Sequence, residues 1–155
     1  MAFWLLLFFP ANILLCMDTA SSHSIPMLPN ETDHLGLIAF KNQITHDPLD
    51  ALGSWNSSRS FCEWQGVSCS HGRQRVTALK LNSMKLEGTI SPSIANLTFL
   101  TTMDLGNNFF RSRIPQELTR LFHLRDLNLT QNLLEGEIPS NFSCLFQLRP
   151  ISISI

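Results

Sequence analysis

Residues 124–139 read LRDLNLTQNLLEGEIP, and the spacing of their apolar side chains repeats every 24 residues from Val76 to the end of the chain. On that period, apolar residues share columns: Val76, Leu100, Leu124 and Leu148; Leu79, Met103, Leu127 and Ile151; Leu81, Leu105, Leu129 and Ile153. A period of this length is typical of a solenoid, in which each repeat buries its apolar face against its neighbours. Because solenoids mostly bind other molecules, the period favours recognition over catalysis.

Each repeat contains a short alternation of apolar and polar residues, as in Leu127-Asn128-Leu129. Such alternation predicts a short strand with one buried face. Three residues after the strand stand Asn108 and Asn132, while the first repeat has Met84 there. Because a buried amide can bond the N–H and C=O groups of neighbouring turns, we expect Asn108 and Asn132 to form a structural ladder.

The N-terminus carries a different pattern. Residues 3–16 are almost wholly apolar (FWLLLFFPANILLC), and a small polar run follows at residues 19–22. This is typical of a secretory signal peptide, here residues 1–24 with cleavage between about 20 and 24. A membrane anchor is the alternative, but Pro10 and Asn12 interrupt the run and spanning takes ~20 apolar residues. We therefore expect no transmembrane segment in the mature chain and a secreted protein.

Five Asn-X-Ser/Thr sequons fit a glycosylated, secreted surface. They lie at Asn30, Asn56, Asn96, Asn128 and Asn141. Cys62 and Cys69 flank the segment CEWQGVSC, for which an oxidising compartment favours one local disulfide. The alternative, a metal site with His71, lacks a fourth ligand at a suitable spacing.

Charge and motifs exclude several functions. Without the leader, whose one charged residue is Asp18, the chain has 11 basic and 11 acidic side chains, which gives no basis for binding nucleic acid. The histidines are scattered, and we expect no metal and no cofactor. Asp104 and Asp126 could lie on adjacent strands, but no hydrolase, phosphate-loop or kinase motif is present. The sequence predicts no catalytic residue and no enzyme activity.

The segment before the repeats predicts a helical cap. Thr32 or Asp33 offers an N-cap for a helix that runs to about Gln43 or Ile44, because the proline after His46-Asp47 ends it. Trp55 and Trp64 are too large to leave exposed, so we expect them to cover the open end of the solenoid core.

The pattern L-x-x-L-x-L-x-x-N-x-L-x-G-x-I-P at residues 124–139 resembles the plant-specific class of leucine-rich repeat. Residues 33–69 resemble the N-terminal cap of plant receptor-like kinases and receptor-like proteins, through LIAFK at 37–41, Asp47-Pro48, Ser54-Trp55-Asn56 and C-x-W-x-G-V-x-C at 62–69. The resemblance implies an α/β solenoid: a leucine-rich-repeat arc of short parallel strands with a helical, disulfide-bonded cap. It divides the chain into a cap at 25–74 and three repeats with a partial fourth at 75–155. Ser112 departs from it, where the family prefers glycine.

The resemblance further implies a truncated receptor-like ectodomain that recognises a protein or peptide ligand outside the cell, with a co-receptor as a further partner. It would lie at the cell surface if it is part of a longer receptor. The kinase domain of the resembled family is absent from these residues. Two alternatives stay open: an apoplastic inhibitor of a secreted hydrolase, and a non-functional fragment of a receptor gene.

The expected ligand-binding surface is the concave face of the arc. Its candidate residues point outward from the strands: Lys80, Thr102, Asp104, Asp126 and Asn128. A solvated sheet face without a ligand is the alternative for these positions. A glycan on Asn128 would lie on this surface and obstruct binding.

Overall fold

The structure is a computed structural model that describes residues 29–142. The predicted signal peptide, the partial fourth repeat and Cys144 lie outside the described residues. Within residues 29–142, no helix has the length and apolar character needed to cross a membrane.

The cap begins with helix α1 (Pro29–Lys41) and continues through strand β1 (Ile44–His46), the 3-10 turn η2 (Phe61–Glu63) and strand β2 (Val67–Cys69). The helix starts before the predicted N-cap and ends at Lys41 instead of Gln43 or Ile44. Lys41 links the end of the helix to the cap loop, because its Nζ donates to the carbonyl oxygens of Leu52 and Trp55 at 3.3 and 2.7 Å. The predicted Cys62–Cys69 disulfide is confirmed.

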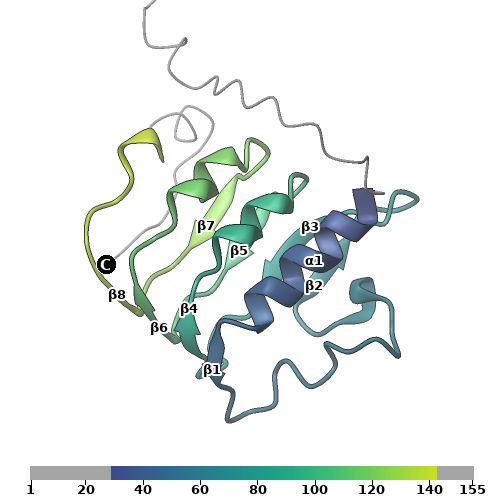
Figure 1. Ribbon diagram of the computed structural model, residues 1–155, viewed down its shortest axis with the longest axis horizontal. Coiled ribbons are helices and arrows are strands. Elements are labelled where there is room, and N and C mark those ends of the chain that lie inside the picture. The colour runs from purple at the N-terminus through teal and green to yellow at the C-terminus, as the bar shows by residue number, and fades with distance from the viewer. Residues whose placement is uncertain (1–28, 143–155) are drawn as a thin grey trace, which may run out of the picture.

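Two four-stranded sheets run along the arc. The sheet that we call the inner sheet has the order β2-β3-β5-β7, with β3 at Val76–Lys80, β5 at Thr102–Asp104 and β7 at Asp126–Asn128. The pairs β3–β5 and β5–β7 are parallel, and β2 closes one edge antiparallel to β3. The predicted short parallel strands are therefore confirmed, and Figure 1 shows β3, β5 and β7 side by side.

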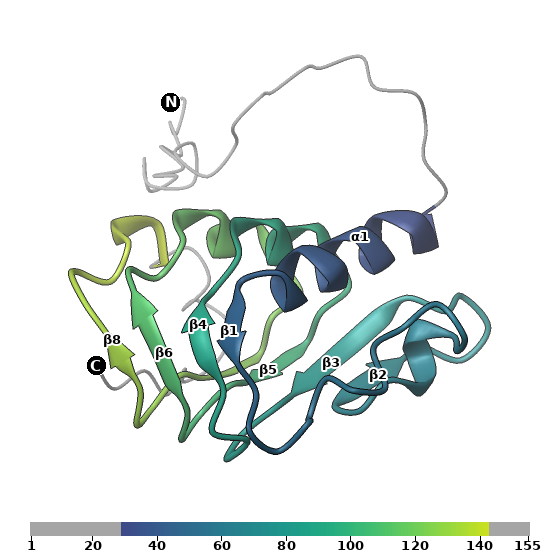
Figure 2. The ribbon, with the colours of Figure 1, turned by 60° about the horizontal axis from the view of Figure 1, so that its bottom comes forward.

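The structure also contains a second sheet, which the sequence did not predict. It has the order β1-β4-β6-β8, with β4 at Glu87–Thr89, β6 at Phe109–Ser112 and β8 at Leu133–Leu134. The third side of the arc is formed by α1 and the 3-10 turns η3 (Pro92–Asn96), η4 (Gln116–Arg120) and η5 (Ser140–Phe142). Figure 2 shows these helical turns in one row with α1, opposite β3 and β5, with β4, β6 and β8 between.

The cap core covers the first repeat as the sequence predicts. Trp55 and Trp64 are 1% and 2% exposed, and their rings stack at a centroid distance of 5.2 Å. Phe40 of α1 contacts both Trp55 and Phe110, at ring centroid distances of 6.1 and 5.9 Å. One aromatic cluster therefore continues from the cap into the repeats.

Asp33 lies within α1 and does not act as the predicted N-cap. Its side chain is fully buried, and Oδ2 and Oδ1 accept from Nε and Nη2 of Arg75 at 2.9 and 2.8 Å. Oδ2 also accepts from the backbone N–H of Val76, the first residue of β3, at 2.8 Å. Arg75 also donates to the Thr98 hydroxyl at 3.0 Å. This buried ion pair fixes α1 against the first strand of the inner sheet.

The side chains of Asn108 and Asn132 lie against the backbone of successive turns. Asn108 donates to the carbonyl oxygens of Leu81, Leu105 and Gly106, and its Oδ1 accepts from the N–H groups of Met84 and Leu86. Asn132 repeats the pattern 24 residues later, donating to Leu105, Leu129 and Thr130 and accepting from Phe110. These amides satisfy backbone groups between the two sheets.

Candidate functional site

The candidate residues lie on the solvent side of the inner sheet. The parallel register aligns Ala78, Thr102 and Asp126 in one row and Lys80, Asp104 and Asn128 in the next. Side chains alternate along a strand, and the residues between the rows, Leu79, Met103 and Leu127, are at most 2% exposed. The rows therefore face away from the core.

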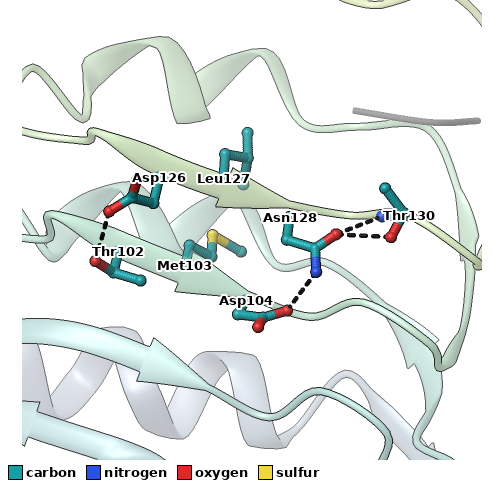
Figure 3. A pocket seen from close by; sticks show the side chains of 7 residues that line it. All are labelled: Thr102, Met103, Asp104, Asp126, Leu127, Asn128 and Thr130. Carbon is teal, nitrogen blue, oxygen red and sulfur yellow. Dashed lines mark hydrogen bonds between the residues drawn. The ribbon is translucent and has the colours of Figure 1, made fainter. Parts of the chain in front are cut away.

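An open hollow of about 380 Å3 lies over β5 and β7. It is lined by Thr102, Met103, Asp104, Asp126, Leu127, Asn128 and Thr130. Figure 3 shows the polar members of this set directed toward one another across the two strands. The hollow thus brings together four of the five predicted positions. Lys80 lies outside its lining, although it is aligned with Asp104 in the register.

Hydrogen bonds hold the polar side chains of the hollow in place. Thr102 Oγ1 donates to Asp126 Oδ2 at 3.3 Å, and Asn128 Nδ2 donates to Asp104 Oδ1 at 2.9 Å (Figure 3). Asp104 Oδ1 also accepts from the backbone N–H of Gly106 at 3.1 Å. Asn128 Oδ1 accepts from both the N–H and the hydroxyl of Thr130, at 3.0 and 2.8 Å. The hollow is therefore preorganised by contacts between adjacent repeats.

Of the residues predicted to point outward, Lys80 is exposed, whereas Asp104 and Asn128 are only partly exposed. The reason is Gly106, which is buried and has no side chain. An added Cβ there would lie 2.5 Å from Asn128 Nδ2. Because glycine has no side chain, the Asn128 amide can pack against the surface of the sheet. In this position Asn128 contacts Asp104 instead of extending into solvent.

Thr130 also lines the hollow, although it is not among the residues predicted from the sequence. The available signal was its place in the Asn128-Leu129-Thr130 sequon, two residues after a candidate position. Its hydroxyl and N–H set the orientation of the Asn128 carboxamide.

The chemistry of the hollow suits hydrogen bonding. Its functional groups are two carboxylates, two hydroxyls and a carboxamide, which accept and donate hydrogen bonds to peptide groups and polar side chains. No group of three or more His, Cys, Asp or Glu side chains in residues 29–142 is arranged to hold a metal ion.

The predicted glycosylation sites fall in different environments. Asn30 lies in α1, Asn56 and Asn96 are exposed, and Asn128 is partly exposed at the hollow. The side chain of Asn141 lies outside the described ones.

Comparison with known proteins agrees with this architecture. The model of the leucine-rich-repeat N-terminal domain matches residues 30–70, and the leucine-rich-repeat model matches residues 99–121 and 123–145. The LRR receptor-like serine/threonine-protein kinase EFR of Arabidopsis thaliana is 48% identical over 90 residues, which are 57% of this chain and 9% of that protein. The chain spans about a tenth of the length of the curated relatives it matches.

Solved structures show the same fold. The BIR3–SERK2 complex from Arabidopsis thaliana matches with a TM-score of 0.68 and 36% identity, over 77% of this chain and 66% of that chain. The Arabidopsis receptor kinase HAESA, solved with the peptide hormone IDA and the co-receptor SERK1, matches with a TM-score of 0.69 and 27% identity, over 78% of this chain and 20% of that chain.

These matches define the class as a capped solenoid of leucine-rich repeats. The chain belongs to the leucine-rich-repeat family and carries the N-terminal domain and repeats found in plant receptor-like kinases.

Proposed function

We propose that the chain is an extracellular recognition module that binds a protein or peptide ligand on the solvent side of the inner sheet. The observation that carries this proposal is the hollow over β5 and β7, whose polar side chains come from adjacent repeats and are held by hydrogen bonds. Side chains held in this way lose little conformational entropy when a ligand binds.

The relatives support the same function. HAESA is solved with a peptide hormone and a co-receptor, and BIR3 is solved with SERK2, so related ectodomains bind both peptides and other ectodomains. A co-receptor ectodomain is therefore a second partner of this chain in our proposal. These relatives favour recognition over the hydrolase-inhibitor and non-functional alternatives.

We also propose that the chain catalyses no reaction of its own. The hollow holds no histidine, cysteine or lysine to act as a base or nucleophile, and its two aspartates bond to neighbouring side chains. The matched segment of the kinases is the N-terminal domain and its repeats.

The test is a binding screen with matched variants. The chain is produced through a plant secretory pathway, its N-linked glycans are removed enzymatically, and it is then screened against a panel of synthetic secreted plant peptides and purified co-receptor ectodomains. Thr102→Arg and Asp126→Arg each place a long side chain in the hollow, while Gln116→Arg adds the same side chain at an exposed position of η4. We expect binding to be lost in the first two variants and retained in the third. Equal binding by all three would refute the inner sheet as the site, and a panel without any binder would refute the recognition function.

A further inference from the structure

The sequons differ in how the hydroxyl of their third residue is used. In the cap, Asn56 Oδ1 accepts from the N–H of Ser58 at 3.1 Å and from its hydroxyl. Asn128 Oδ1 accepts from the corresponding groups of Thr130. At Asn96, the Thr98 hydroxyl instead accepts from Arg75. Asn128 therefore shares its local hydrogen bonds with a sequon whose asparagine is exposed.

Asn128 differs from Asn56 in its surroundings. The amide nitrogen of Asn56 donates to Gly53 within the cap loop, whereas that of Asn128 donates to Asp104 at the wall of the hollow. Among the contacts described for residues 29–142, this is the single hydrogen bond of Asn128 Nδ2. Its second N–H therefore has no hydrogen-bond partner among these contacts.

We propose that Asn128 is an N-glycosylation site whose sugar chain closes the hollow over β5 and β7. In the transfer, Asn128 Nδ2 displaces a lipid diphosphate from the anomeric carbon of an oligosaccharide: an N–C bond forms, the C–O bond to the diphosphate breaks, and Nδ2 releases one proton. The remaining N–H can still donate to Asp104, so the modification is compatible with the folded sheet. Because an N-linked chain is bulky, its attachment at the wall covers the hollow.

Glycans at the other exposed sequons leave the hollow open. Asn96 ends η3, which lies on the side of the arc opposite β5 (Figure 2). Asn56 lies in the cap, between α1 and η2. Of the sequons at Asn56, Asn96 and Asn128, only the last therefore controls access to the hollow, and its effect on ligand binding rests on the function proposed above.

The test measures access without a ligand. The full chain is secreted from plant cells, and peptide mass spectrometry after enzymatic glycan release gives the occupancy of each sequon. A Thr102→Cys variant then reports access through the rate at which a bulky maleimide labels the peptide containing position 102. Gln116→Cys on η4 is the matched control. If Thr102→Cys is not secreted, Asp126→Cys, which is exposed at the same hollow, takes its place.

We expect Asn128 to be occupied and position 102 to react about tenfold more slowly before glycan removal than after it, because a bulky chain shields the thiol. Asn128→Gln should give the fast rate without any treatment, while Asn96→Gln should leave the slow rate unchanged. An unoccupied Asn128, or an occupied one with equal labelling rates, overturns the proposal. Because no ligand enters these measurements, either result is distinct from a failure of the recognition function.

Discussion

Replacing Asp33 with alanine should destabilise the cap and its attachment to the repeats. The carboxylate is fully buried and accepts three hydrogen bonds, two from the Arg75 guanidinium and one from the N–H of Val76. Alanine leaves a guanidinium that is 10% exposed without its counter-charge, and it leaves the backbone N–H without a partner. Removing one member of a buried pair costs about 3–5 kcal/mol of unfolding free energy.

This cost predicts a large change in melting temperature. At about 2.1 cal/mol/K per residue, the residues from 29 to 142 lose roughly 4 °C per kcal/mol, so Asp33→Ala should lower Tm by about 12–20 °C. Arg75 keeps its bond to Thr98 and its position over the Phe99 ring at 4.5 Å, which places the cost toward the lower part of that range. The assay is thermal and urea unfolding followed by tryptophan fluorescence, since Trp55 and Trp64 are buried in the cap.

A double variant separates charge from packing. Asp33→Leu with Arg75→Met removes both charges, leaving mainly the unpaired N–H of Val76, and should cost only about 1–3 kcal/mol. The double variant should therefore be more stable than Asp33→Ala. A loss below about 1 kcal/mol in the single variant, or a double variant less stable than it, would refute the assignment of the buried pair.

Three further substitutions test the repeat geometry by urea unfolding. Asn108→Ala should lower the unfolding free energy by about 3 kcal/mol, because it removes the partner of five backbone groups; a loss below about 1 kcal/mol would contradict this. Ser112→Gly should raise it by about 0.5–1 kcal/mol, because Ser112 has a φ of 72°, and an unchanged midpoint would count against that strain. Gly88→Ala should lower it by about 3 kcal/mol or more, because the new Cβ would lie 2.2 Å from the Gln43 carbonyl oxygen; Gly72→Ala, with no atom within 4 Å, is the control and should cost less.

The repeat strands of the inner sheet, β3, β5 and β7, could be predicted because each buries an apolar residue at a fixed place in the 24-residue period. These residues are Leu79, Met103 and Leu127. The second sheet could not be predicted in this way. Strand β4 contains Gly88, β8 has only two residues, and β1 comes from the cap, so no alternation identifies them. Their pairing depends on contacts between repeats, such as that of Gly88 with Ile44, which sequence periodicity does not contain.

The candidate site was partly predictable for the same reason. The period places Thr102 beside Asp126, and the two side chains are hydrogen-bonded in the structure. The period does not predict that the Asn128 side chain bends toward Asp104, because this orientation depends on the space left by glycine at position 106. The role of Asp33 was also hidden, because a carboxylate near a helix start fits an N-cap and its partner Arg75 is 42 residues away.

The backbone conformation repeats every 24 residues more strictly than the residue types do. Ser83 and Asn107 both have positive φ values, 60° and 54°, and their N–H groups donate to the carbonyl oxygens of Gly106 and Thr130, each bond at 2.9 Å. The same hydrogen bond is thus repeated one turn further along, although neither residue is glycine. Each turn is held by the next, so a residue that disfavours the left-handed region must still adopt it. The same holds for the positive φ of Ser112, which is imposed by the neighbouring repeats. Glycine at this position would keep the same backbone contacts while removing the strain.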